Sequence, residues 1–168
     1  MFIKKTLAVA LIPLFAATAL SAESVPIMGT VESKCSIFTD TQGVYGNPTP
    51  NLLSTARADG GVNPVIRYDV ATADYYKAKI THPNTFSSSP SLPDFVAWDG
   101  TTSVKEVTDP LMSDYDTNKV EYNNVTEFDL TVAGTVWFEV ESSADYGVNK
   151  ALPAGNYTAL IVAECIAK

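Results

Sequence analysis

The sequence has little of what catalysis and metal binding need. Its single histidine, His82, precedes Pro83 in a serine-rich stretch, and no serine lies in a GxSxG-like setting. No CxxC or histidine-rich stretch offers metal ligands. We therefore expect no catalytic centre, no metal and no cofactor, and we expect His82 to be an exposed loop residue. A glycosidase-type pair of carboxylates stays open, because spacing in sequence does not give spacing in space.

Side chains that carry oxygen atoms alternate in one stretch, at Asp114, Asp116 and Asn118. Calcium prefers such oxygen clusters. However, Lys119 stands where an EF-hand loop needs glycine, and Val125 stands where it needs a closing glutamate. The pattern therefore indicates a solvated acidic loop.

Basic residues and long apolar runs are also scarce. The one long apolar run, Leu7 to Leu20, follows Lys4 and Lys5 and ends in small residues, so residues 1–22 are typical of a secretory signal peptide. The other 146 residues, 23–168, suit one domain with nine basic and 19 acidic residues, a net charge of −10. That charge argues against nucleic acid and anionic membranes as partners. No second run is long enough to span a membrane.

Cysteine occurs only twice, as Cys35 and Cys165, near the two ends of residues 23–168. Two cysteines in an exported chain most often form one disulfide. We therefore predict that Cys35 and Cys165 are bonded, which ties the first strand of the domain to the last.

Sustained helical periodicity, internal repeats and heptads are absent, and alternation of apolar and polar residues is frequent. Strands are expected over 24–38, 125–132 and 135–141, with turns between them. A hairpin is expected to join 65–70 to 75–81, and a second to turn at Asp99-Gly100. The proline-rich stretch 82–93 is expected to be a loop outside any ladder, and a short helix is expected near Leu52 or Leu111. Nine or ten short strands predict an all-β, Ig-like sandwich.

The last stretch, 152–168, begins with turn-forming residues and continues as an alternating strand. Tyr157, Ala159, Ile161, Ala163 and Cys165 fall on one face. Apolar residues on both faces indicate a strand covered on both sides, or one paired at an edge inside a sandwich.

Gly155 followed by this alternation resembles the C-terminal strand of chaperone–usher pilus subunits. In that family a periplasmic chaperone grips the strand, which later borders a groove that a donor strand from the next subunit fills. The resemblance implies the same interface role for a set of five residues. They are Gly155, Tyr157, Ala159, Ile161 and Ala163.

The N-terminal pattern Val25, Ile27, Gly29, Val31 with Cys35 close behind resembles the start of the pilin fold. Two registers are open: the pattern is the first strand of the fold, or it is the donor motif that inserts into a neighbour. The family commonly pairs a first-strand cysteine with one on the following strand, whereas here the only other cysteine is on the last.

These features favour a structural, non-enzymatic subunit of a surface fimbria, a pilin-like sandwich assembled by donor-strand exchange. The resemblance implies a periplasmic chaperone, an outer-membrane usher and neighbouring subunits as partners, and passage through the periplasm to the cell surface. The alternative is a self-complete secreted binding module, with aromatic residues that stack on carbohydrate. The candidates for stacking are Tyr45, Tyr75, Tyr76, Phe86, Trp98 and Trp137.

Overall fold

The computed structural model describes residues 23–30 and 34–168. The chain divides into two units, residues 1–31 and 32–168. The expected signal peptide, 1–22, and Val31 of the N-terminal pattern lie outside the described residues. Residues 23–30 contain no helix or strand, and their side chains are exposed. The strand predicted over 24–38 is therefore wrong for 24–30, because alternation alone makes no strand without a hydrogen-bonded neighbour.

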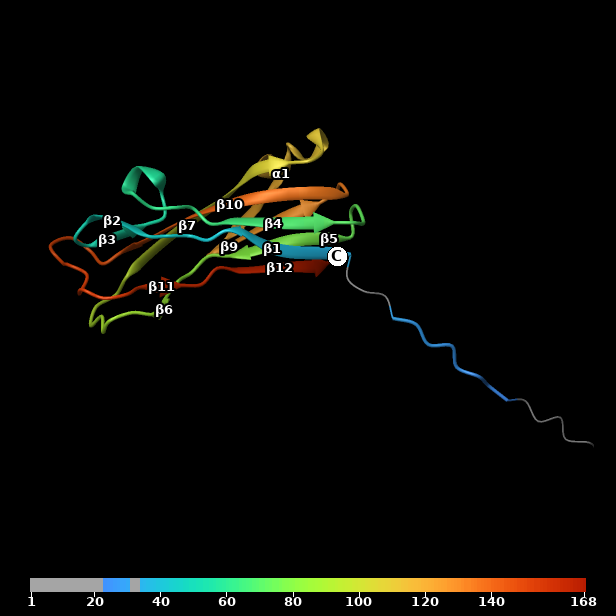
Figure 1. Ribbon diagram of the computed structural model, residues 1–168, viewed down its shortest axis with the longest axis horizontal. Helices are drawn as coiled ribbons and strands as arrows, with labels where there is room; N and C mark the ends of the chain where they lie inside the picture. The colour runs from blue at the N-terminus through green and yellow to red at the C-terminus, as the bar shows by residue number, and fades with distance from the viewer. Residues whose placement is uncertain (1–22, 31–33) are drawn as a thin grey trace, which may run out of the picture. The chain divides into compact units, whose positions relative to one another are not determined.

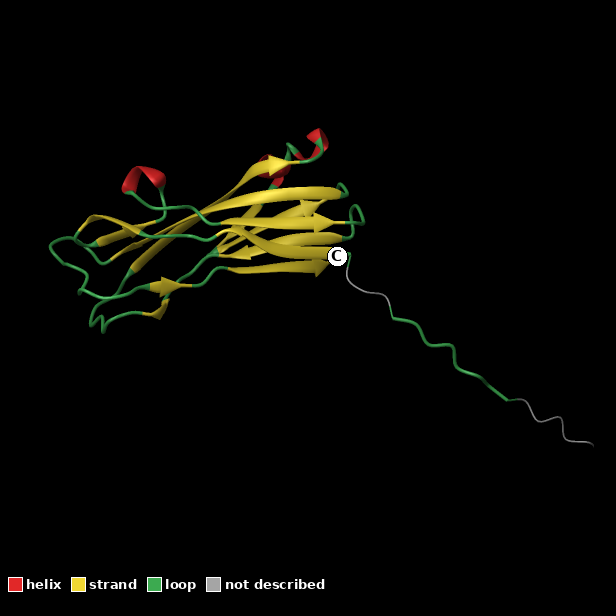
Figure 2. Cartoon of the chain, in the orientation of Figure 1, coloured by secondary structure: helices red, strands yellow, loops and turns green. Residues whose placement is uncertain are grey.

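The second unit is all-β, as predicted (Figure 2). Its strands are β1 (Cys35–Thr41), β2 (Gly46–Thr49), β3 (Leu52–Ser54), β4 (Val65–Val70), β5 (Tyr76–Thr81), β6 (Phe86–Ser88), β7 (Ala97–Val107), β8 (Val120–Tyr122), β9 (Val125–Leu130), β10 (Gly134–Asp145), β11 (Thr158–Ala159) and β12 (Val162–Ala167). Its helices are single turns: η1 (Arg57–Asp59), η2 (Pro110–Met112) and α1 (Tyr115–Asn118). The short helix expected near Leu111 is confirmed.

Two antiparallel sheets form the sandwich (Figure 1). In the first, β4 lies between β1 and β10, while β7 pairs with the other side of β10. Beyond β4, the far end of β10 pairs with β3, which in turn pairs with β2. In the second sheet the order is β12-β5-β9-β8, and β11 pairs separately with β6. The first and last long strands therefore lie at the edges of different sheets.

The core lies between the inward faces of these sheets. On β10 the side chains of Val136, Phe138 and Val140 are fully buried, which confirms the alternation predicted over 135–141. The Phe138 ring lies 5.5 Å from the Tyr68 ring of β4 and 4.2 Å from the Phe128 ring of β9. Each such buried side chain contributes about 1.5–3 kcal/mol. This aromatic cluster therefore holds the two sheets together.

The hairpin predicted for 65–70 and 75–81 is wrong, because β4 and β5 belong to different sheets. Each strand has one apolar face, and the two faces pack against each other across the core. The link crosses between the sheets with Asp74 at a φ of 57°. Lys168 at the end of the chain bonds to the Asp74 carboxylate.

The turn predicted at Asp99-Gly100 is also wrong, because β7 runs straight through these residues. A Cβ at Gly100 would lie 2.5 Å from His82 Nδ1. Glycine is therefore present so that the strand can pass close over an imidazole, and not for a turn. The stretch 82–93 likewise does join a ladder, because β6 within it pairs with β11.

His82 is buried, with 4% of its surface exposed, so the expectation of an exposed loop residue is wrong. It follows β5, and its Nε2 lies 3.1 Å from Thr126 Oγ1 of β9 and 3.2 Å from Thr102 Oγ1 of β7. Its Nδ1 is buried without a hydrogen-bond partner. The imidazole thus sits between the two sheets and bridges their hydroxyls.

Burial lowers the pKa of His82 below its ordinary value of 6.5, so the folded protein favours the neutral ring. Below pH 6.5 the unfolded chain takes up a proton that the folded chain resists. We expect the free energy of unfolding to fall by up to about 1.4 kcal/mol per pH unit until the lowered pKa is reached. Urea unfolding of the protein and of His82→Gln at a series of pH values measures this. An equal slope in both proteins between pH 6.5 and 5.5 contradicts it.

Candidate functional site

The outer edges of β1 and β12 are open. Each strand pairs with one neighbour only, β1 with β4 and β12 with β5, among the residues that the structure describes. The two strands run side by side along one flank of the sandwich (Figure 1). Where such a strand edge is open, its N–H and C=O groups form a template on which another strand can pair.

The disulfide between Cys35 and Cys165 joins these two edges, as predicted. It connects the first residue of β1 to β12 across 130 residues of sequence, with the Cα atoms 6.3 Å apart. Such a bond is compatible with an exported protein, because disulfides persist in oxidising compartments.

Beyond the disulfide, the flank opens into a hollow of about 400 Å³, which we call the edge groove. One wall is the segment from Thr39 to Tyr45, and the other is Thr158 to Ile161. Its floor reaches between the sheets to the buried residues Ile66, Thr55 and Ser142. A second hollow of about 400 Å³ continues it, lined by Val44, Leu53 and residues 155–159.

The polar groups at the floor of the edge groove are bonded to one another. Tyr45 Oη lies 3.2 Å from Ser142 Oγ, and the Thr55 hydroxyl accepts from the Ser142 backbone N–H at 2.9 Å. Burial raises the pKa of the Tyr45 phenol, so it stays a neutral hydroxyl at physiological pH. The floor therefore has few free polar groups, which suits apolar side chains from a bound strand.

The five interface residues inferred from the C-terminal strand lie along this flank. Gly155 lies in a bend against Pro90, where a Cβ would be 2.5 Å from the proline Cγ. Tyr157 donates its hydroxyl to the Pro153 carbonyl, and Ala159 and Ile161 line the edge groove. Ala163 lies on β12, partly buried against the core. The outer face of this stretch is exposed, so it is paired at an edge and covered on one side only.

The N-terminal strand-insertion residues lie in the first unit. Val25 and Ile27 are 78% and 98% exposed, and Gly29 lies in the same non-strand segment. Their role in insertion stays a prediction.

The opposite flank of the sandwich is protected, which the sequence did not predict. Both carboxylate oxygens of Asp116 accept from the backbone N–H of Val104 on β7, at 2.9 and 3.0 Å. Lys119 Nζ donates to the Thr102 carbonyl of the same strand at 2.9 Å. The alternating residues were expected to form a solvated loop. One of them, Asp116, instead caps the edge of a strand. A local sequence pattern could have identified a helical turn before this cap, because Asp109-Pro110 is typical of a helix start. In the structure the Asp109 carboxylate accepts from the Leu111 N–H.

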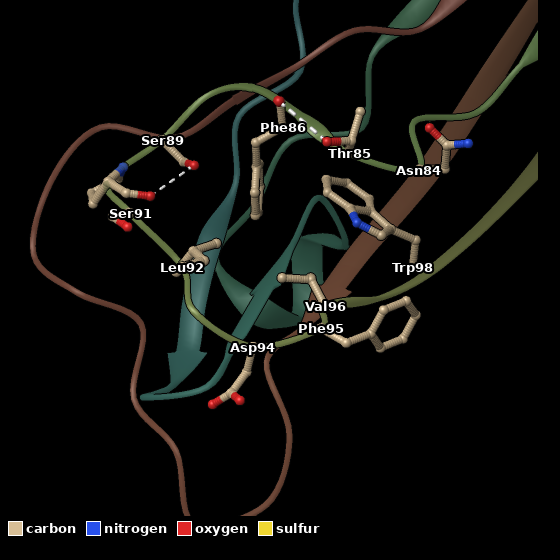
Figure 3. Close-up of a pocket in the computed structure, with 11 residues that line it drawn as sticks. Asn84, Thr85, Phe86, Ser89, Ser91, Leu92, Asp94, Phe95, Val96 and Trp98 are labelled. Carbon is tan, nitrogen blue, oxygen red and sulfur yellow. Dashed lines mark hydrogen bonds between the residues drawn. The ribbon is translucent and has the colours of Figure 1, made fainter.

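Of the six aromatic candidates for stacking, Phe86 and Trp98 meet edge to face, with ring centroids 4.6 Å apart. Tyr76 is buried in the core beside Tyr75, and Tyr45 belongs to the edge groove. Figure 3 shows Phe86 and Trp98 at a hollow of about 440 Å³, with Leu92 across from them. This hollow is lined mainly by residues of the stretch that connects β5 to β7.

Comparison with models of protein families gave no match, and comparisons with curated proteins and with solved structures gave none either. In residues 23–30 and 34–168, no helix has the length and apolar character to cross a membrane. The same residues contain no cluster of three or more His, Cys, Asp or Glu side chains that could hold a metal ion.

Proposed function

We propose that the chain is a structural, non-enzymatic subunit of a surface fibre, assembled by addition of a β-strand from a neighbouring subunit. The observation that carries the proposal is the edge groove, an open hollow between the β1 edge, at Thr39, and the segment of residues 158–161 that leads into the β12 edge. Main-chain hydrogen bonds to such edges give affinity, and alternate side chains entering the hollow give specificity.

The order of the strands supports the proposal. In an Ig constant-type sandwich the first, second, fifth and fourth strands form one sheet, and the third, sixth and seventh form the other. Here β1, β4, β10 and β7 form one sheet, which matches this order when β9, paired with β5 in the second sheet beside β12, is counted as an additional strand. Among the described residues, no strand pairs with the outer edge of β12. An inserted strand would take the place of the seventh.

The exposure of apolar residues beside the edges points the same way. Ile161, which lines the edge groove, packs on the core and is only partly buried. Leu160 and Val162, on the outer face, are 64% and 51% exposed. Covering apolar surface contributes roughly 25 cal/mol per Å², so an added strand would gain free energy here.

The partners that the resemblance implies are a periplasmic chaperone, an outer-membrane usher and neighbouring subunits of the same fibre. A chaperone strand would protect the open edges in transit through the periplasm, before the subunit reaches the cell surface. An isolated subunit is expected to self-associate, because an exposed strand edge beside apolar surface recruits other chains.

The N-terminal pattern is the proposed donor. Val25, Ile27, Gly29 and Val31 share one face of an extended chain, so they would enter a groove together. Gly29 would occupy the shallowest position, where the backbone passes closest to the groove.

Gly29→Leu is expected to block assembly and to leave the melting temperature of the subunit unchanged. The added side chain overfills the receiving groove, at a cost of about 1–3 kcal/mol, while residues 23–30 are exposed in the subunit itself. Size-exclusion chromatography measures assembly, and thermal unfolding measures stability. Met28→Leu, on the other face of the same segment, is the matched control and should assemble normally. If Gly29→Leu assembles as well as this control, the segment is not the donor.

The hollow at Trp98 supports a second candidate function, the binding of a neutral saccharide. Aromatic faces stack on sugar rings, and the hollow presents Asn84 and Ser91 beside Trp98. Titration with common monosaccharides, followed by tryptophan fluorescence, tests this function. A saturable change that Trp98→Ala abolishes supports it, and no change with any sugar contradicts it.

A further inference from the structure

The disulfide sets a limit on where a strand can enter between β1 and β12. Neighbouring strands lie about 4.8 Å apart, so a strand inserted between two others needs about 9.6 Å between them. The Cα atoms of Cys35 and Cys165 are 6.3 Å apart. At the disulfide, the two edges are therefore too close to receive a strand.

The hollow begins some distance from this closed end. Its nearest lining residues are Thr39, four residues after Cys35, and Ile161, four residues before Cys165. Four residues of extended chain span about 13 Å. From there the walls run from Thr39 to Tyr45 and from Ile161 to Gly155. Each wall covers six residue steps, which span at most about 20 Å of extended chain, so the open part can hold at most a strand of about seven residues.

The length of the open part matches the proposed donor. From Val25 to Val31 there are also six residue steps, about 20 Å when extended. The donor would thus place its four alternating side chains over the open part and none beside the disulfide.

We propose that the Cys35–Cys165 disulfide closes one end of the edge groove, so that it accepts a strand of about seven residues from a second copy of this chain, at the open end only. This inference rests on the proposed function and adds to it the position and length of the bound strand. The closed part, from Cys35 to Ile37 and from Ala163 to Cys165, takes no part in binding.

Hydrogen–deuterium exchange tests this proposal on the full chain with its disulfide intact. A synthetic peptide of residues 24–32 is added in excess, and the same peptide with its residues in scrambled order is the control. We expect slower exchange over 39–45 and 155–161, by at least about tenfold, and unchanged exchange over 35–37 and 163–167. Lengthening the peptide by four alternating valine and threonine residues at either end is expected to change its Kd by less than about twofold, because residues added at one end meet the part closed by the disulfide and residues added at the other end extend past the groove.

The outcomes separate this proposal from the proposed function. Protection that extends over 163–167, or a Kd that falls tenfold or more with the longer peptide, overturns the limit set by the disulfide and leaves strand addition intact. Protection in neither segment, with the scrambled and natural peptides alike, overturns both strand addition by this donor and the limit derived from it.

Discussion

Removing the Cys35–Cys165 disulfide is expected to lower the free energy of unfolding by about 5 kcal/mol. The bond closes a loop of 130 residues, nearly the whole described sandwich. In the chain-entropy view, so long a loop restricts the unfolded chain strongly, and losing the bond restores that freedom to the unfolded state alone. Because domains of this size are stable by only about 5–15 kcal/mol, the loss is a large part of the total.

Urea unfolding of the protein and of the double variant Cys35→Ser/Cys165→Ser measures this effect. The protein treated with reductant should match the double variant, and reductant should change nothing in the variant itself. A difference below about 1 kcal/mol between oxidised and serine proteins would mean that the bond restricts the unfolded chain far less than the chain-entropy view requires.

Ala159→Arg is expected to weaken strand binding about 100-fold, which corresponds to roughly 3 kcal/mol. Ala159 lines both hollows of the flank and is half-buried on β11. Arginine there would fill the space that the side chains of the proposed donor would enter, and a bound strand would bury its charge without a partner. The subunit itself should keep its stability, because the hollow has room for the side chain.

Binding of the peptide of residues 24–32 to each variant measures the effect. Ala167→Arg is the matched control, since Ala167 is exposed on β12 beyond the disulfide. Equal loss of binding in both variants would show that charge, and not obstruction of the edge groove, is responsible. Unchanged binding to Ala159→Arg would place the strand elsewhere.

Patterns that depend on one strand alone were predictable from the sequence. Alternation over 135–141 correctly gave the buried face of β10, and the turn-formers near Gly155 gave the start of the last stretch. In these cases the period of two and the local turn residues carry the information. The disulfide was predictable as well, because only two cysteines exist.

Features that depend on which strands meet were not predictable. Asp99-Gly100 has the composition of a turn, yet its glycine serves the close approach of β7 to His82, which comes from a distant part of the chain. The link after Val70 is short enough for a hairpin, and only the packing of two apolar faces sends β5 to the other sheet. In the same way, the wall of the edge groove that belongs to the last stretch could be predicted from the sequence. The wall from Thr39 to Tyr45 and the cap by Asp116 could not, because they depend on how distant strands pack.

The cap on β7 has a consequence for the shape of the assembly. Asp116 and Lys119 occupy backbone groups of β7 at Val104 and Thr102, β8 is three residues long, and β2 contains a proline. Under the proposed strand addition, a subunit with one receptive flank and one arm would have one neighbour on each side, so chains of such subunits would grow in single file without branching. Freeing the edge of β7 would create a second point of attachment, and the filament would then become a network.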